Sequence, residues 1–252
     1  MQSDLSSQQL HALEQLRHEI ARDHLFQPDD TLPANDYTLT RFLRAHAFNV
    51  PQAKSMLANC LQWRRSAEGV GITNLYRTID PFDFPERHYV FEHWPMYFHK
   101  CGRPVNIQSL GAANLPTLYK RVPHARLWQT LLVNTEALFA EVFPAASAAA
   151  GSHIEQSLVI IDLKGFSLHQ FWQMKSLARS CLEITQTQFP ETMGQLVLIN
   201  APASFTIIWA GIKPLLSAES ARKVSILGAD HADALRALVP VENLPVVVGR
   251  AE

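Results

Sequence analysis

Side chains that could carry catalytic chemistry are sparse and scattered in this chain. Ser157, Asp162 and His169, with a Ser-His pair at 152–153, supply the residue types of a hydrolytic nucleophile, acid and base. Ser157 is expected to begin a strand, however, whereas the nucleophile of an α/β hydrolase stands on a sharp turn between a strand and a helix. The motifs GxGxxG, GxxxxGKS/T, HExxH and GxSxG are all absent from the sequence. We therefore assign no catalytic residue.

Metal chemistry has equally little support. None of the 11 histidines stands four residues from another, so no helix would present two imidazoles to one ion. Cys60, Cys101 and Cys181 are odd in number and form no CxxC pair, which also disfavours a disulfide framework. Asp162 and Lys164 close an expected strand, and we favour a structural role in which Asp162 caps the next turn while Lys164 is solvated. We expect neither a metal nor a cofactor.

The strongest functional signal is an apolar segment at 204–216. Phe205, Ile208, Trp209 and Ile212 follow the i, i+3, i+4, i+7 spacing of one helix face. The other apolar side chains of the segment are Ile207, Ala210, Leu215 and Leu216. A helix that is apolar on almost every side is normally buried, yet a polar and charged stretch follows directly. The segment is either a lid over an apolar binding site or an ordinary core helix, and the residue pattern leaves both interpretations open.

Alternating strands and helices must position this segment. Strand-like runs are expected at 105–110, 157–162, 195–199 and 224–227, with a weaker one at 246–248. Helical patterns lie at 125–142, 168–188, 204–216 and 231–238. Strands separated by helices of this length form parallel crossover units, so the predicted fold class is α/β with a mostly parallel sheet.

The first third of the chain reads as helical. One amphipathic helix is expected within 3–24, and Asn35 and Asn49 are the residue type that caps two further helices, beginning near Tyr37 and Val50. The stretch from 69 to 100 is rich in aromatic residues and interrupted by prolines. We predict a small N-terminal helical domain at residues 1–68, followed by a second domain at residues 69–252.

The composition excludes several classes of protein. The chain has 252 residues, of which 47% are hydrophobic and 18% charged, as in an ordinary globular protein. A net charge of −1 leaves no basic footprint for nucleic acid. The N-terminus shows no signal-peptide pattern, and no apolar run reaches the length of a transmembrane helix. We expect a cytoplasmic protein that does not span a membrane and has no nucleic-acid partner.

Several short segments follow one another in a specific order between residues 30 and 249. They are LTRFLRAHAFNV at 39–50, NCLQWR at 59–64, IDLKG at 161–165, INAP at 199–202 and ENLP at 242–245. In this order they resemble the CRAL-TRIO lipid-binding family, close to the fungal phosphatidylinositol/phosphatidylcholine transfer proteins. The resemblance implies that the sheet floors an apolar lipid pocket, which the segment at 204–216 covers as a gate helix. An apolar helix near a surface is then accounted for, because one side covers acyl chains and the other can meet a bilayer.

The resemblance also implies head-group residues. In relatives that bind phosphatidylinositol, four side chains surround the inositol phosphate, and the matching positions here are His46, Glu191, Ser220 and Lys223. The acid and the lysine are kept, and serine preserves a hydroxyl. His46 stands where relatives carry arginine, so the planar fork and the permanent charge suited to a phosphate are lost.

A choline-phosphate site is implied as well, but it is degenerate in this chain. The matching positions are Phe98, Asn106 and Thr135 for tyrosines, and Ser157 and Val159 for a hydroxyl pair. Aromatic faces attract a quaternary ammonium, and only one aromatic ring and one member of the hydroxyl pair remain. The resemblance therefore favours phosphatidylinositol over phosphatidylcholine as the ligand.

The function expected from the resemblance is that of a cytosolic, monomeric, non-enzymatic protein that exchanges one phospholipid between membranes. Its partners would be the lipid and, transiently, a membrane surface to which it is peripheral. We expect the stripe centred on Trp209 to carry the membrane contact, the alternative being that Trp209 points inward. Three other functions stay open: a carrier of a sterol, squalene or haem, a lipid-presenting regulator of phosphoinositide synthesis, and an unrelated hydrolase.

Overall fold

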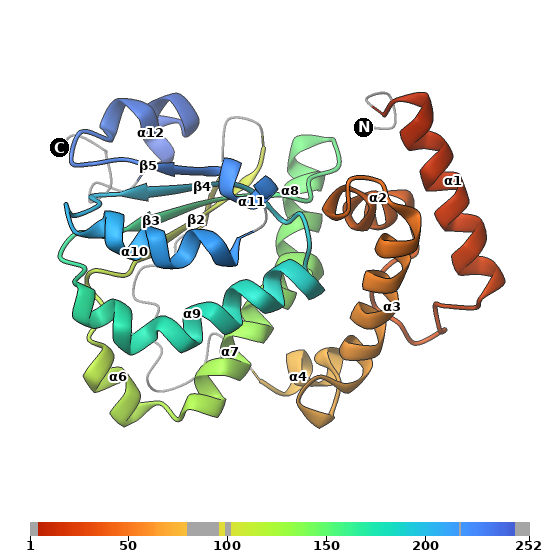
Figure 1. The fold of residues 1–252 in the computed structure, drawn as a ribbon, viewed down its shortest axis with the longest axis horizontal. Helices are drawn as coiled ribbons and strands as arrows, with labels where there is room; N and C mark the ends of the chain where they lie inside the picture. Colours follow the sequence, from red (N-terminus) through yellow and green to blue (C-terminus); the bar gives the residue numbers. More distant parts are fainter. Residues whose placement is uncertain (1–4, 80–95, 99–101, 217, 245–252) are drawn as a thin grey trace. The chain divides into compact units, whose positions relative to one another are not determined.

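The computed structural model describes residues 5–79, 96–98, 102–216 and 218–244, which form two compact units. The helical unit contains the described residues up to Ile79 together with Ile184–Glu191, and the sheet unit contains the others (Figure 1). The helical unit runs on through α4 (Ile72–Thr78), a helix that was not predicted. The domain boundary expected at residue 68 stays a prediction.

Side-chain caps begin the three main helices of the helical unit. α1 (Ser7–Arg22) opens with a capping box between Ser6 and Gln9. α2 (Asp36–Ala45) and α3 (Val50–Ser66) begin after Asn35 and Asn49, whose side-chain oxygens accept backbone N–H groups at 3.0 and 3.1 Å. These three helices and both asparagine caps confirm the sequence prediction.

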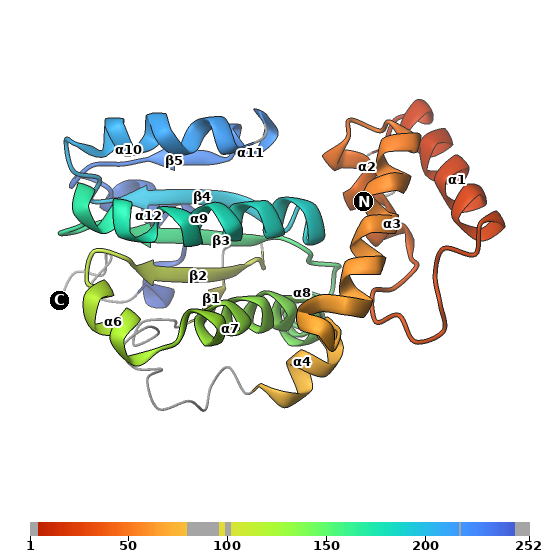
Figure 2. The ribbon, with the colours of Figure 1, turned by 60° about the horizontal axis from the view of Figure 1, so that its bottom comes forward.

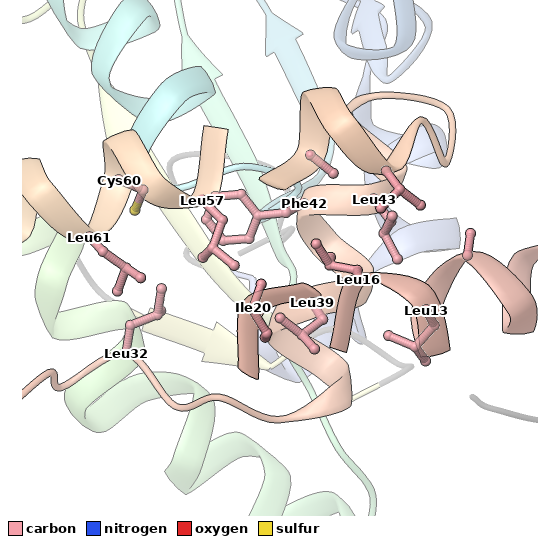
Figure 3. Close-up of a cluster of buried hydrophobic side chains, with 13 residues drawn as sticks. Leu13, Leu16, Ile20, Leu32, Leu39, Phe42, Leu43, Leu57, Cys60 and Leu61 are labelled. Atoms are coloured by element: carbon pink, nitrogen blue, oxygen red, sulfur yellow. The ribbon is translucent and has the colours of Figure 1, made fainter. Parts of the chain in front are cut away.

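The same three helices pack through one cluster of buried side chains (Figure 3). Its labelled members are Leu13, Leu16, Ile20, Leu32, Leu39, Phe42, Leu43, Leu57, Cys60 and Leu61. Positions 13, 16 and 20 recur at helical spacing, so they lie on one face of α1. Each buried leucine of this kind stabilises the fold by roughly 1.5–3 kcal/mol, which offsets the ordering of a short helical chain.

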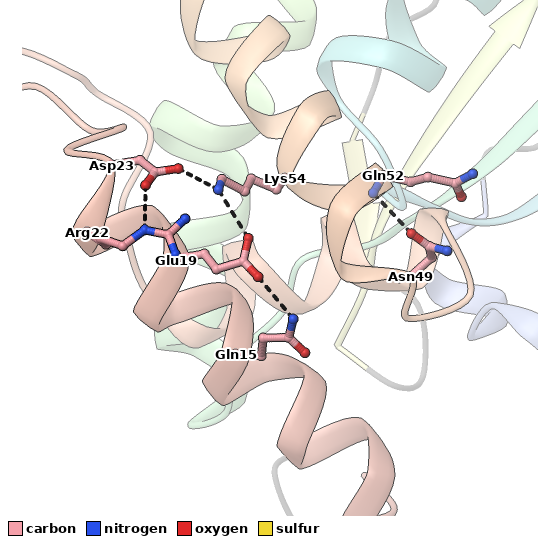
Figure 4. A network of polar contacts seen from close by, with 7 residues as sticks. All are labelled: Gln15, Glu19, Arg22, Asp23, Asn49, Gln52 and Lys54. Carbon is pink, nitrogen blue, oxygen red and sulfur yellow. Dashed lines mark hydrogen bonds and ion pairs between the residues drawn. The ribbon is translucent and has the colours of Figure 1, made fainter.

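A polar network aligns α1 with α3 (Figure 4). Lys54 Nζ lies 3.1 Å from an oxygen of Glu19 and 2.5 Å from one of Asp23. Hydrogen bonds from Arg22 and Lys54 lower the pKa of Asp23 to about 2. Because Arg22 and Asp23 are exposed and Lys54 and Glu19 are only partly buried, water screens these charges, and the network orients the helices more than it stabilises them.

The sheet unit is built on five strands in the order β1-β2-β3-β4-β5. They are β1 (Met96–Phe98), β2 (Pro104–Ser109), β3 (Ser157–Asp162), β4 (Met193–Ile199) and β5 (Val224–Ile226). Strands β2 to β5 are parallel, and β1 pairs antiparallel with β2. The mostly parallel α/β sheet is therefore confirmed, whereas the weak strand expected at 246–248 lies outside the described residues.

Helices connect the parallel strands, and a last helix follows β5. They are α6 (Leu115–Arg121), α7 (His124–Ala137), α8 (Phe143–Ala150), α9 (Leu168–Gln188), α10 (Phe205–Ile212), α11 (Ala218–Arg222) and α12 (Ala232–Leu238). The helix predicted at 125–142 changes at residue 138 into a π-helical turn, Leu138–Val142. The helix predicted at 204–216 ends at Ile212 and tightens into a 3₁₀ turn at Lys213–Leu215, where Pro214 cannot continue the α-helical bonding.

Different helices cover the two faces of the sheet (Figures 1 and 2). Successive strand residues point to opposite faces. Leu235 of α12 and Val239 directly after it pack with Val105, Ile107, Leu158, Ile160, Val197 and Ile199. The opposite face lies toward α9 and α10, where Leu198 and Leu163 contact Phe171, Phe205 and Ile208. The α12 face is a closed core, and the face toward α9 and α10 is packed by a separate cluster.

Candidate ligand-binding site

An apolar cavity of about 400 Å³ lies between the sheet and helices α6, α7, α9 and α10. Its floor is formed by Gln108, Ile161, Leu196 and Leu198, which share one sheet face because they alternate along their strands. The volume falls within the range of small-molecule pockets. None of the described residues that line the cavity carries a charge. The site therefore suits an apolar ligand or the apolar part of a larger one.

One side of α9 forms a wall of the cavity. Its lining residues are Phe171, Met174, Leu177, Ala178, Cys181 and Leu182. They recur every three or four residues, so they form a single stripe on a helix of 21 residues. The helix was predicted with the bounds that the structure has, but its part in the cavity was not. The apolar stripe on an otherwise polar helix was the available signal.

The segment expected to form a gate supplies another wall. Phe205, Ile208, Trp209 and Ile212 all line the cavity, and Phe205 and Ile208 are buried. In the structure Trp209 thus points inward, as in the alternative considered above, and contact of this stripe with a bilayer stays a prediction. The outward side instead presents Ile207, which is 60% exposed. Both sides of α10 are apolar, so residue spacing predicted the stripe without deciding which side faces the cavity.

The polar side chains of the lining are all neutral. They are Gln108, Ser109, Tyr119 and Cys181. The hydroxyl of Tyr119 donates to the backbone oxygen of Gln173 at 3.4 Å, and burial raises the pKa of this phenol. Burial also raises the pKa of the Cys181 thiol to about 11, so the thiol is protonated at neutral pH. Such a lining can donate and accept hydrogen bonds but has no ionic partner for a charged head group.

Close contacts between loops hold the chain in place at the carboxyl ends of the strands, next to the cavity. A β-carbon on Gly111 would lie 1.9 Å from the backbone oxygen of Lys164, so only glycine fits there. A carboxylate oxygen of Asp162 accepts the N–H of Lys164 and the side-chain amide of Asn200, both at 2.8 Å. Asp162 thus ties the ends of β3 and β4 together, and Lys164 is exposed. The predicted structural role of Asp162 is confirmed.

The hydrolytic set considered above is not assembled. Ser157 and Asp162 stand at opposite ends of β3, roughly 16 Å apart at the rise of a strand. The Ser157 hydroxyl donates to the backbone oxygen of Thr192 at 3.4 Å, and a ring nitrogen of His153 lies 3.3 Å from Glu155. His169 contacts Gln173 on α9. Over the described ranges, no three His, Cys, Asp or Glu side chains gather as a metal site would require.

The four predicted head-group residues divide between the two units. His46 ends α2, and Glu191 has a left-handed backbone with φ 62°, both in the helical unit. Ser220 and Lys223 belong to one turn of the sheet unit, in which the backbone N–H of Lys223 donates to the backbone oxygen of Ser220 at 3.1 Å. The ammonium group of Lys223 also lies 3.9 Å from a carboxylate oxygen of Glu219. That all four side chains meet at one phosphate group stays a prediction.

The degenerate choline positions occupy the sheet and α7. Asn106 and Val159 are register partners on the same sheet face as Gln108 and Ile161. The Asn106 side-chain oxygen is buried and has no hydrogen-bond partner among the described residues. Thr135 donates its hydroxyl to the Leu131 backbone oxygen at 2.9 Å.

Ser157 is likewise bonded to backbone, and Phe98 lies in β1. None of these positions belongs to the described cavity lining. Hydroxyls of Thr135 and Ser157 are already bonded to the chain, so the choline pattern is not reassembled from them.

An α/β sheet with an uncharged cavity under a short apolar helix is typical of a class of proteins that enclose an apolar ligand. Comparison with known families agrees with it: a CRAL/TRIO domain matches residues 88–249, and a CRAL/TRIO N-terminal domain matches residues 9–59. The chain belongs to the CRAL/TRIO family.

Named relatives and a solved structure are similar to the chain over most of its length. The SEC14 cytosolic factor of Eremothecium gossypii is 36% identical over 98% of this chain and 77% of the relative. The phosphatidylinositol/phosphatidylcholine transfer protein SFH7 of Arabidopsis thaliana is 33% identical over 88% of this chain and 41% of the relative. The crystal structure of Sfh5 superposes with a TM-score of 0.65, at 15% identity, over 92% of this chain and 84% of that one, and shows the shared fold. None of the helices in the described part of the chain is long and apolar enough to cross a membrane.

Proposed function

We propose that this protein binds one phospholipid, with an acyl chain in the cavity, and exchanges it between membranes without making or breaking a covalent bond. The observation that carries the proposal is the uncharged cavity walled by the inner stripe of α10. Relatives named as cytosolic factors and as phosphatidylinositol/phosphatidylcholine transfer proteins support it. The protein acts as a monomer in the cytoplasm and meets membranes only at their surface. It needs no cofactor, because the lipid is the ligand.

Transfer through water is slow because acyl chains are apolar. Each methylene that leaves a bilayer for water costs about 0.8 kcal/mol, so a dozen methylenes cost about 10 kcal/mol. A cavity lined by side chains such as Leu196, Leu198 and Leu177 replaces the bilayer interior during transit. The protein lowers the barrier by keeping the chain dry, and this step requires neither a nucleophile nor a general base.

The helix α10 has the properties of a movable cover. Its N-cap residue, Ser204, makes no side-chain cap bond, in contrast to the N-cap residues of α1, α2 and α3. The helix has only 8 residues and contains Gly211, which costs about 1 kcal/mol relative to alanine within a helix. Short, weakly capped elements open at lower free energy than the core of a fold. Displacement of α10 would open the cavity while the sheet stays intact.

Phosphatidylinositol is the proposed ligand. Glu191, Ser220 and Lys223 keep residue types that suit an inositol phosphate, whereas Asn106 and Thr135, at tyrosine positions of the choline site, offer no aromatic face for a quaternary ammonium. In this proposal the phosphate is bound outside the cavity by the head-group residues, because the cavity lining is uncharged.

The proposal is tested by identifying the ligand and by measuring its exchange. Native mass spectrometry of the purified protein should show one phospholipid per monomer. Transfer of labelled phosphatidylinositol between vesicles should exceed transfer of labelled phosphatidylcholine. Protein that retains no phospholipid and transfers neither lipid would refute the function, and hydrolysis of a bound ester would point instead to an enzyme.

A second candidate ligand is favoured by the neutral lining. Gln108, Ser109, Tyr119 and Cys181 can bind a hydroxyl or carbonyl without any ion pair. A sterol would satisfy such a site, as would another hydrophobic ligand with one polar group. A sterol, squalene or haem mass in the same spectrum would assign the protein to that class. Retained phosphatidylinositol with negligible vesicle transfer would instead indicate a lipid-presenting regulator.

A further inference from the structure

Two side-chain amide atoms near the cavity are buried and have no hydrogen-bond partner among the described residues. They are the oxygen Oδ1 of Asn106 in β2 and the nitrogen Nδ2 of Asn134 on α7. Buried polar atoms of a folded chain are normally paired, so each of these atoms needs an explanation. The oxygen accepts hydrogen bonds and the nitrogen donates them. The sheet unit therefore holds one unused acceptor and one unused donor.

The side chain of Asn106 lies on the cavity side of the sheet. Successive strand residues alternate between the two faces, and Gln108, two residues further along β2, lines the cavity. The register partner of Asn106 is Val159, which shares its face with the lining residue Ile161. Asn106 is thus one step closer than the cavity floor to the amino ends of the strands.

Asn134 continues the stripe of α7 that lines the cavity. Leu127 and Leu131 belong to the lining, and Asn134 follows Leu131 by three residues, about one helical turn. The chain leaves β2 at its carboxyl end and re-enters the sheet at the amino end of β3, so α7 runs against the direction of β2 (Figure 2). The last turns of α7 therefore lie toward the amino ends of the strands, as Asn106 does. Both amides are next to the same end of the cavity.

A hydroxyl group is the simplest partner for these two amides. It can donate its hydrogen to the oxygen of Asn106 while its own oxygen accepts from the nitrogen of Asn134. A quaternary ammonium has no N–H to donate and could not satisfy the Asn106 oxygen. An ionised group would need a counter-charge, and none of the described residues that line the cavity carries one. The amides therefore favour an uncharged group that both donates and accepts.

We propose that Asn106 and Asn134 form a polar subsite for the free hydroxyl of an uncharged lipid, such as a sterol or a diacylglycerol, whose apolar body fills the cavity. The inference rests on the proposed function only in that the cavity holds a lipid. It gives the protein a second ligand, bound with its polar group inside, in addition to phosphatidylinositol, whose phosphate stays outside. Because both ligands need the same apolar space, loading one displaces the other.

The test compares each alcohol with the same lipid lacking the hydroxyl. Purified full chain is titrated with tritiated cholesterol and with cholest-5-ene, and in a second arm with dioleoylglycerol and with dioleoyl propanediol. Each pair shares its apolar body and differs in the free hydroxyl. The parent protein should bind one alcohol at least about tenfold more tightly than its deoxy analogue, as expected for hydrogen bonds to otherwise unpaired buried groups. The arm that shows this preference identifies the lipid.

Variants assign the preference to the two amides. Asn106→Leu and Asn134→Leu keep a similar shape without the hydrogen-bonding atoms, so each should lower the ratio of the two dissociation constants at least about fivefold. Gln188→Leu is the matched control, because it removes a buried amide oxygen that also has no partner among the described residues but belongs to the helical unit. Its ratio should equal that of the parent. Purely structural asparagines would instead change the binding of alcohol and analogue alike and leave the ratio unaltered.

Equal affinity of the parent protein for both alcohols and their analogues would overturn the subsite. A preference that persists in both asparagine variants would overturn it as well, and would assign the hydroxyl to another polar residue of the lining, such as Gln108 or Tyr119. Transfer of phosphatidylinositol between vesicles is measured separately on the same proteins. A parent that prefers the alcohol but transfers no phosphatidylinositol would support the subsite and refute only the transfer function.

Discussion

Gly211 of α10 packs directly against Phe171 of α9, since a β-carbon at position 211 would lie 3.8 Å from Cζ of that ring. This is an ordinary van der Waals distance, so alanine fits without displacing its neighbour. Alanine would also remove the cost of about 0.5–1 kcal/mol that glycine imposes inside a helix. The new contact with Phe171 and the removal of the glycine cost should both stabilise α10 in its position over the cavity.

We therefore expect Gly211→Ala to slow lipid exchange about fivefold, because stabilising the closed state by about 1 kcal/mol reduces the open population by that factor. The measurement is the rate of phosphatidylinositol transfer between vesicles. Gly228→Ala is the control, since its β-carbon would meet no atom within 4 Å and it lies outside α10. Transfer at or above the parent rate would show that α10 does not move during exchange.

Since Trp209 points inward, a charge at position 209 should affect the cavity and the stability of the fold. Trp209→Asp would place a carboxylate in an uncharged cavity, so bound lipid should be lost and the free energy of unfolding should fall by about 3 kcal/mol. Ile207→Asp on the outer side of the same helix should leave both nearly unchanged and impair only vesicle binding. Native mass spectrometry and denaturant unfolding of the pair check this. Retention of lipid by Trp209→Asp would place the tryptophan outside the site.

Lys223 tests the head-group proposal. Lys223→Ala should reduce phosphatidylinositol transfer about tenfold or more, because a hydrogen bond to a charged group contributes about 1.5–3 kcal/mol. The exposed Lys120→Ala is the matched control, and His46→Arg is the complementary gain variant, since it restores a guanidinium fork. Transfer kinetics of both lipids are compared for each protein. Equal losses for phosphatidylinositol and phosphatidylcholine would assign Lys223 a structural role.

Asn106 carries a buried oxygen with no hydrogen-bond partner among the described residues. Leucine has nearly the same shape and removes the unmade bond, so Asn106→Leu should raise the free energy of unfolding of lipid-free protein by about 1 kcal/mol. Val159→Leu at the register partner provides a control for added apolar volume. Thermal melting after delipidation gives the result, and a lower melting temperature for Asn106→Leu would mean that the amide is bonded in solution.

The buried thiol of Cys181 should make the free energy of unfolding depend on pH in the alkaline range. Burial raises the pKa of its thiol from 9.0 to about 11, so unfolded protein loses this proton at lower pH than folded protein does. The contribution is complete below about pH 9, is lost as pH rises toward about 11, and amounts to about 3 kcal/mol. The difference in unfolding free energy between the parent and Cys181→Ala, followed by denaturant titration, should decline over that window. A constant difference would indicate that the thiol is in contact with water.

Local sequence determined where most helices and strands of this protein form. Asn35 and Asn49 predict two helix starts because a short side-chain oxygen satisfies N–H groups that the first turn leaves unpaired. The segment 168–188 predicts α9 with its observed bounds, and the runs at 157–162 and 195–199 predict central strands of a parallel sheet. Capping and periodicity act over a few residues, so they can be recognised without knowing what packs against them. Short elements such as α4 and β1 lack that periodic signal.

Only the tertiary structure decided which sides of these elements face the cavity. Trp209 and Ile207 both lie on an apolar helix, and only contact with the sheet and with Phe171 turns the first inward and leaves the second outside. On α9, likewise, Phe171 and Trp172 are adjacent aromatic residues, yet one lines the cavity and the other is exposed. Hydrophobicity has no direction of its own, so the inside of a binding site is defined by the surfaces that enclose it and not by the residue types along one segment.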